Sequence, residues 1–249
     1  VMPGVVRHTN NRAGASSYGR YIVIEHEGTV PSIYTLYAHL SAIADGLRVG
    51  QQIAEAQVIA TMGHTSGGYT IPRDRAHLHF EMGVRLTDRF QSWYDWKKFG
   101  SKNDHGLWNG MNLVGFDPLA FYDAFREHQV DNFRDFLRSQ SAALTIRVAT
   151  SEVPDFATRY PSLLTTLVAP ERLVGWDVKI NTTGLPFSWT PLTAEQMGDQ
   201  REGSVRIVQV DEAAVKACHC KDLVKWRRGE PEPDRDLNTL LQLLFGFRR

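Results

Sequence analysis

The stretch Tyr18-Gly-Arg-Tyr-Ile-Val-Ile-Glu-His26 decides the fold class of this chain. Its residues alternate between apolar and polar and are rich in β-branched and aromatic types, which predicts a half-buried β-strand. A turn at residues 27–31 and a second strand at residues 32–38 follow it, so the two strands form a hairpin. Residues 57–62 and 76–82 have the same strand character, and glycines separate these segments. Short strands with little helical periodicity predict a small antiparallel β-sandwich or barrel.

The character of the sequence changes further along the chain. Residues 88–116 are rich in aromatic residues, Asn and Gly, and we expect a packed loop there. The other predicted elements are a helix from Pro118 to about Arg138, strands at 144–149 and 205–210, and helices at 211–226 and 234–245 separated by a Gly/Pro breaker at 229–233. We therefore predict a mainly β N-terminal domain, residues 1–140, and an α+β C-terminal region, residues 141–249.

Composition excludes several classes of function. The chain has 249 residues with 28 Lys and Arg against 28 Asp and Glu, so no bulk attraction to nucleic acid is expected. It contains no run of about 18 apolar residues, so we predict no transmembrane segment. The chain begins at Val1 in mid-pattern without an initiator Met, and we expect further sequence, including any export signal, upstream of it. The oligomeric state is left open.

Two histidines in Ala76-His-Leu-His-Phe-Glu81 are the first candidates for a functional site. Side chains alternate along a strand, so His77 and His79 point to the same face. Two imidazoles side by side are a poor apolar pair but suit a metal site or an acid–base site. A structural or surface pair remains the alternative. His39, at the end of a strand before a turn, is a further candidate, with a surface histidine as its alternative.

The remaining candidates carry weaker signals. His26 is expected on the hairpin surface, and we assign no site role to it or to His64 in a loop, His105 in a turn and His128 in the long helix. Cys218-His-Cys220 supplies potential metal ligands, but no second Cys/His cluster completes a tetrahedral set. We therefore favour a thiol pair on a helix.

Five sequence blocks, taken together, resemble one known family. They are Tyr18 to His26, the Tyr-Ala-His39-Leu-Ser41 block, Val49-Gly50 leading to Gln57-Val-Ile59, Gly63, and His77-Leu-His79-Phe-Glu81. Their order and approximate spacing over residues 1–85 are similar to those of the lysostaphin/LytM-type zinc metalloendopeptidases. This resemblance implies a small antiparallel β fold that binds one Zn²⁺ and hydrolyses peptide cross-links of bacterial peptidoglycan. It also implies an extracytoplasmic location, because the substrate lies there.

The resemblance also implies a role for each histidine. His79 corresponds to a zinc ligand, while His39 and His77 correspond to the catalytic histidines beside the metal-bound water. Zinc lowers the pKa of such water toward ~7. The family's other two ligands belong to a His-x-x-x-Asp motif, which does not occur in this chain. Val1 to Val6 looks like the end of the strand that follows that motif, so we expect the motif upstream of Val1.

Two other functions deserve comparison. Leu47-Arg-Val-Gly50 with Gln57-Val-Ile59 resembles a biotinyl or lipoyl carrier domain, but a carrier needs a lysine on its hairpin and the first lysine here is Lys97. A non-catalytic LytM-like module that binds the cell wall or activates an amidase is the second alternative. We favour the catalytic interpretation, because a module without catalysis has no chemical need for His39, His77 and His79 together.

Overall fold

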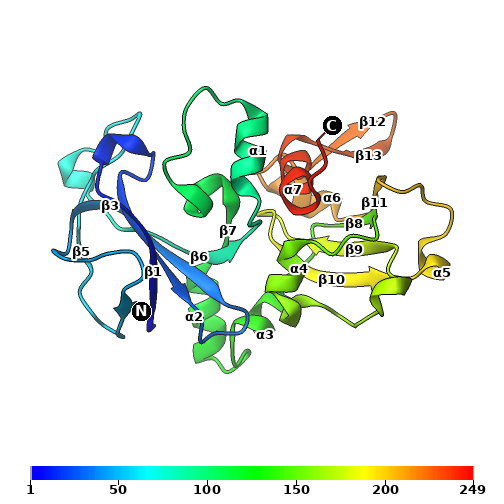
Figure 1. The fold of residues 1–249 in the computed structure, drawn as a ribbon, viewed down its shortest axis with the longest axis horizontal. Coiled ribbons are helices and arrows are strands. Elements are labelled where there is room, and N and C mark those ends of the chain that lie inside the picture. The colour runs from blue at the N-terminus through cyan, green and yellow to red at the C-terminus, as the bar shows by residue number, and fades with distance from the viewer. Residues whose placement is uncertain (1, 249) are drawn as a thin grey trace. The chain divides into compact units, whose positions relative to one another are not determined.

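The computed structural model describes residues 2–248 and divides them into two compact units (Figure 1). The first unit contains the residues up to Arg85 together with Lys102–Tyr122. The second contains Leu86–Ser101 and the residues from Asp123 onward. The chain therefore passes between the units more than once. The functional boundary expected near residue 140 stays a prediction.

The first unit is built on one antiparallel sheet. Its strand order is β4-β1-β2-β3-β6-β7, and β5 pairs with β3 outside that path. The strands are β1 (Gly4–Asn10), β2 (Arg20–His26), β3 (Ile33–Ile43), β4 (Gln52–Ile53), β5 (Ala60–Met62), β6 (His79–Arg85) and β7 (Leu113–Phe116). The predicted hairpin is β2 and β3, and the mainly β character of this region is confirmed.

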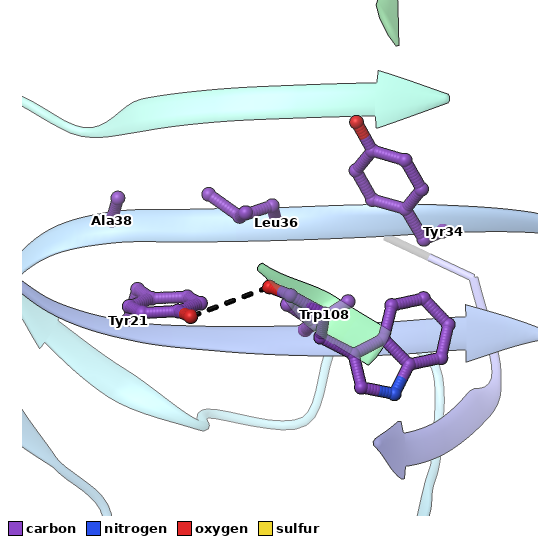
Figure 2. Close-up of a cluster of buried hydrophobic side chains, with 6 residues drawn as sticks. Tyr21, Tyr34, Leu36, Ala38 and Trp108 are labelled. Carbon is purple, nitrogen blue, oxygen red and sulfur yellow. Dashed lines mark hydrogen bonds between the residues drawn. The ribbon is translucent and has the colours of Figure 1, made fainter. Parts of the chain in front are cut away.

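Both faces of this sheet carry apolar clusters. We call the first the Tyr21 face, and it holds a buried cluster of Tyr21, Val23, Tyr34, Leu36, Ala38 and Trp108. Figure 2 shows this cluster and the Tyr21 hydroxyl donating to the Trp108 carbonyl at 3.3 Å. The opposite face buries Val6, Ile22, Ile24, Leu40 and Ile53. Alternate residues of β2 thus enter opposite layers, which explains the alternation of the deciding stretch.

Two glycines bring the loop after β5 against the sheet. Gly19 has a φ of +65°, and a Cβ there would lie 2.2 Å from the Thr65 carbonyl oxygen. A Cβ on Gly63 would lie 2.4 Å from the Ser41 backbone nitrogen. Only glycine permits these backbone approaches. The loop around Thr65 is therefore held next to β3, where the candidate site begins.

The second unit contains a four-stranded antiparallel sheet of order β10-β9-β8-β11 and a β12–β13 hairpin. Its strands are β8 (Leu144–Ala149), β9 (Gly175–Ile180), β10 (Pro186–Leu192), β11 (Val205–Val210), β12 (Val224–Arg227) and β13 (Glu230–Pro233). In its core Trp189 stacks on Phe156, with ring centroids 5.2 Å apart. The expected strands at 144–149 and 205–210 are confirmed as β8 and β11, and the α+β character of this region is confirmed.

The helices of the described residues are short. They are α1 (Phe90–Lys97), α2 (Pro118–Arg126), α3 (Phe133–Arg138), α4 (Asp155–Arg159), α5 (Ala194–Met197), α6 (Glu212–Ala217) and α7 (Arg235–Phe245). The helix expected at 234–245 is confirmed as α7. Between residues 2 and 248, no helix combines the length and apolar character that crossing a bilayer requires.

Three sequence predictions about helices were wrong. The expected loop at 88–116 contains α1, because Phe90, Trp93 and Tyr94 share a buried face at helical spacing. The long helix expected from Pro118 divides into α2 and α3 near His128, whose φ is +56°. The helix expected at 211–226 ends at Ala217, and β12 follows it. The presumed breaker includes Gly229, which with Arg228 has positive φ and forms the tight turn of the β12–β13 hairpin.

Candidate active site

The sequence analysis expected His39 at the end of a strand. The structure places it instead at an irregularity inside β3. The pairing of β2 with β3 shifts register here, and His39 adopts a left-handed φ of +59°. Such a φ is uncommon outside glycine and marks a position that the surrounding structure enforces. The His39 backbone N–H donates to the Tyr18 carbonyl at 2.9 Å. A β-bulge re-aims a side chain relative to the alternation of a regular strand.

The three candidate histidines come together as a result. The His39 ring centroid lies 5.0 Å from that of His77 and 5.5 Å from that of His79. His39 is 4% exposed, His79 is half-buried and His77 is exposed. The strand expected at 76–82 begins only at His79, and His77 instead forms an isolated bridge with Gly63. The structure thus places all three imidazoles beside one another at the edge of the Tyr21 face.

Backbone carbonyls assign the tautomers of His39 and His77. The Nδ1 atom of His39 lies 2.8 Å from the Thr65 carbonyl oxygen, and Nδ1 of His77 lies 2.9 Å from the Arg75 carbonyl oxygen. A carbonyl only accepts, so each Nδ1 carries the proton and each neutral ring presents Nε2 as an acceptor. Burial lowers the pKa of His39, the Thr65 carbonyl opposes that shift, and the neighbouring His79 and His77 add to it. Both Nε2 atoms can therefore accept a proton.

Glu81 fixes the third imidazole. In the β3–β6 pairing Ala38 lies opposite His79 and Leu36 lies opposite Glu81, so both β6 residues belong to the Tyr21 face. The His79 Nε2 donates to Glu81 Oε1 at 2.8 Å. Neutral His79 therefore carries its proton on Nε2 and leaves the Nδ1 lone pair unprotonated.

Two tyrosines complete the hydrogen bonding of the same carboxylate. Tyr18 donates to Glu81 Oε1 at 2.7 Å, and Tyr34 donates to Glu81 Oε2 at 3.0 Å. Burial alone would raise the pKa of Glu81, but the donors from His79, Tyr18 and Tyr34 outweigh it and lower that pKa. Burial and the adjacent Glu81 raise the pKa of Tyr18. The sequence analysis named Glu81 only as part of a motif and gave it no role. Its position two residues after His79, on the same face of a strand, could have indicated that its carboxylate binds the imidazole.

Replacing Glu81 with Gln is expected to destabilise the first unit by about 1–3 kcal/mol, because a charged acceptor of three hydrogen bonds is lost. It is also expected to release the His79 tautomer. Denaturant unfolding measures the first effect, and imidazole ¹⁵N NMR of the metal-free chain measures the second. Glu27→Gln, an exposed carboxylate elsewhere in this unit, is the matched control. An unchanged fraction of Nε2-protonated His79 in Glu81→Gln contradicts the positioning role.

The glycine-rich loop after β5 borders the histidines. Thr65 accepts from His39 through its carbonyl and donates its hydroxyl to the Leu40 carbonyl at 2.8 Å. The ring of Tyr69 lies 6.4 Å from that of His39, and its hydroxyl donates to the Ser17 carbonyl at 3.3 Å. Tyr69 is half exposed, at 52%. The site therefore has an exposed aromatic side chain next to its buried imidazole.

The residues present fit a zinc ion only in part. His79 offers a free Nδ1 with its Nε2 held by a carboxylate, an arrangement typical of metal-ligating histidines. A zinc site in an enzyme takes three protein ligands and leaves one position open. Within residues 2–248, however, no three or more His, Cys, Asp or Glu side chains lie close enough to hold a metal ion. His79 is thus suited to be one ligand, but these residues do not supply a complete set.

A second histidine pair lies on the Tyr21 face and was missed by sequence reasoning. The His8 ring lies 4.9 Å from that of Tyr21, and its Nε2 lies 3.3 Å from His105 Nδ1. His105 Nε2 donates to the Ala15 carbonyl, so neutral His105 accepts from His8. Burial lowers the pKa of His8 to about 4, and His105 contributes to the shift. Nearly 100 residues separate the two imidazoles, so no local pattern reveals their contact.

This shift predicts a specific acid sensitivity. Because the His8 pKa is lower in the folded chain, at about 4, than its ordinary 6.5, protonation favours unfolding. The neutral ring's contribution is complete above pH 6.5 and is lost as the pH falls toward 4, by at most ~3 kcal/mol. Urea unfolding of the wild type and of His8→Phe at pH 7 and pH 4 should show a smaller drop in the variant. Equal drops in the two proteins contradict the prediction.

His26 is buried rather than on the hairpin surface. It is fully inaccessible, with Nδ1 2.9 Å from the Pro3 carbonyl oxygen and Nε2 2.8 Å from the Thr35 hydroxyl. Both ring nitrogens are thus satisfied by the protein, and burial lowers the pKa of His26. The His26 ring links the Pro3 backbone to the Thr35 side chain, and its sequence position beside Glu27-Gly28 did not indicate these contacts. Its role is structural.

Comparison with known proteins bears on the first 90 residues. Residues 1–90 match the model described as Peptidase family M23, so the resemblance stated above is confirmed for this segment. No curated protein matches the chain.

Three solved structures illustrate the local similarity to known proteins. A zinc-containing peptidase from Vibrio cholerae is 32% identical over 32% of this chain and 21% of its own, with a TM-score of 0.26. A putative glycyl-glycine endopeptidase lytM from Ruminococcus gnavus is 23% identical over 33% of this chain and 31% of its own, with a TM-score of 0.27. LytU is 21% identical over 49% of this chain and 61% of its own, with a TM-score of 0.30. The chain thus spans under two thirds of the length of each of them.

Proposed function

Since residues 1–90 match peptidase family M23, we propose that this protein is a metallopeptidase that hydrolyses peptide cross-links of bacterial peptidoglycan. The observation that carries the proposal is the convergence of His39, His77 and His79 at one edge of the Tyr21 face. We assign the hydrolytic function to residues 1–140 and treat residues 141–249 as a separate α+β region.

In this proposal His39 and His77 serve as general base and general acid. Each has its Nδ1 proton bound to a backbone carbonyl, so each presents an Nε2 that accepts a proton from a water molecule. Once protonated, the same Nε2 can donate to the oxygen or the amine of the peptide bond being broken. The left-handed backbone at His39 holds its ring in place before the substrate arrives. The entropic cost of orienting this ring therefore does not add to the barrier of the reaction.

Zinc is part of the proposal through His79 alone. We assign His79 Nδ1 as one ligand, with Glu81 as the residue that positions it. The proposal requires two further ligands that residues 2–248 do not supply. A His-x-x-x-Asp motif, which the family resemblance implies, would provide them. The substrate lies outside the cytoplasm, and we accordingly propose an extracytoplasmic location.

The test is metal removal from the protein encoded by the complete reading frame. Incubation with purified peptidoglycan is expected to release new amino groups, with about one zinc bound per chain. Treatment with 1,10-phenanthroline should stop the release, and added Zn²⁺ should restore it. A protein with no bound zinc and no amine release contradicts the proposal.

A non-catalytic module is the second candidate, and one observation favours it. The described residues contain no group of three His, Cys, Asp or Glu side chains that could hold a metal ion. In that case the protein would bind peptidoglycan, or activate an amidase, without releasing amino groups itself. Sedimentation with insoluble peptidoglycan, measured beside amine release, distinguishes the two: binding without hydrolysis supports the module.

A further inference from the structure

The segment after α6 brings together the two cysteines of the chain. Cys218 is the capping residue that directly follows α6, and Cys220 lies two residues further along in a loop. Their sulfur atoms lie 3.1 Å apart, within hydrogen-bonding distance. Cys218 is half-buried and Cys220 is exposed, so a small reagent in solvent can reach the pair. The sequence analysis expected both cysteines on a helix, but the structure places them after the end of α6.

The surroundings treat the two thiols differently. Burial would raise the pKa of Cys218, but hydrogen bonds from the Cys220 thiol and from the backbone N–H groups of Cys220 and Lys221 lower it, with help from the Lys221 charge. The hydrogen bond to Cys218 raises the pKa of Cys220. The Thr182 carbonyl, 3.3 Å from the Cys218 sulfur, accepts from its thiol form and is outnumbered by these donors. Cys218 is thus the better nucleophile and Cys220 its proton donor.

We propose that Cys218 and Cys220 form a thiol–disulfide exchange site whose substrate class is a low-molecular-weight disulfide. The Cys218 thiolate attacks one sulfur of that disulfide, forms a mixed disulfide and expels the first thiolate. Cys220 then loses its proton and attacks the Cys218 sulfur, which forms the Cys218–Cys220 bond and expels the second thiolate. Two protein thiols are oxidised, and the external disulfide is reduced to two thiols.

The geometry suits a disulfide better than a metal site. A disulfide requires about 2.05 Å between the sulfur atoms, roughly 1 Å less than the observed separation. Cys220 lies in a segment without regular secondary structure, so its movement breaks no helix or strand pairing. A tetrahedral metal site would need further ligands, and over residues 2–248 none gathers with the two thiols.

Mass spectrometry after incubation with oxidised glutathione tests this site directly. The chain contains two cysteines, so every product is assigned without ambiguity. The wild type is expected to lose two free thiols and the mass of two hydrogen atoms, without a retained adduct. Cys220→Ser, which keeps a hydroxyl donor beside Cys218, is expected to retain one glutathione on Cys218. A wild type that retains glutathione, or that keeps both thiols, overturns the proposal.

The asymmetry of the pair gives a second measurement. At neutral pH, iodoacetamide is expected to modify Cys218 in Cys220→Ser about tenfold faster than Cys220 in Cys218→Ser. Equal rates overturn the assignment of Cys218 as the attacking thiol. Both variants are expected to fold, because each exchanges one atom at an exposed or half-exposed position. Circular dichroism of each variant checks this. Neither readout involves peptidoglycan or zinc, so this result and that of the proposed peptidase are independent.

Discussion

Replacing His79 with Ala is expected to lower amine release from peptidoglycan by on the order of 10³-fold, and to abolish zinc binding. A bound metal contributes several kcal/mol to such a reaction, and each 1.4 kcal/mol is a factor of ten. His79 is the one residue of the described chain with a free imidazole nitrogen whose partner nitrogen is held by a partly buried carboxylate that two tyrosines also bind. Zinc content and amine release are measured on the protein from the complete reading frame.

Leu78→Ala is the matched control for His79. Leu78 lies between the two histidines in the chain, is 43% exposed and has no role in the proposed chemistry. It is expected to keep both zinc and activity. Retention of full activity by His79→Ala removes the basis for the metallopeptidase proposal.

Replacing His39 or His77 with Ala is expected to lower kcat by about 10²–10⁴-fold while zinc binding is retained. Each side chain offers one Nε2 as proton acceptor, and removal of a positioned acid–base group costs that range. The double variant is expected to lose less than the product of the two single losses, because groups that act as a unit are not additive.

His128→Ala controls for the loss of an imidazole as such. His128 is exposed and lies between α2 and α3 in the second unit, whereas the residues of the proposed site belong to the first unit. Its activity is expected to match the wild type. If His39→Ala loses zinc together with activity, the residue is a metal ligand rather than an acid–base group, and the assignment made here is wrong.

Much of the fold was accessible from local pattern. The alternation in Arg20–His26 and the turn after it predicted the β2–β3 hairpin, because strand periodicity depends on neighbours along the chain. The helices were less accessible. Phe90, Trp93 and Tyr94 have helical spacing, but the surrounding Asn, Gly and Trp residues obscured a helix of only eight residues. The break at His128 and the turn at Gly229 depend on backbone conformations that composition alone does not specify.

The sequence by itself determined that His77 and His79 lie close together, because two residues of separation along the chain depend on nothing distant. The structure places His77 in an isolated bridge just before β6 rather than in the strand that the sequence predicted. It also determined the match to peptidase family M23 over residues 1–90. The tertiary structure alone decided that His39 joins them. A regular strand turns His39 away from the side of Ala38, and the register shift with its left-handed backbone brings it back.

The partners of these histidines were likewise decided by packing. Glu81 meets Tyr18 and Tyr34 from segments that precede it by more than 40 residues, and His8 meets His105 from the other end of the unit. Such contacts form only when the strands are paired and the loops have packed on the Tyr21 face. The hydrogen bond from His39 to the Thr65 carbonyl likewise depends on packing. It requires Gly19, since any side chain at that position would collide with the Thr65 backbone.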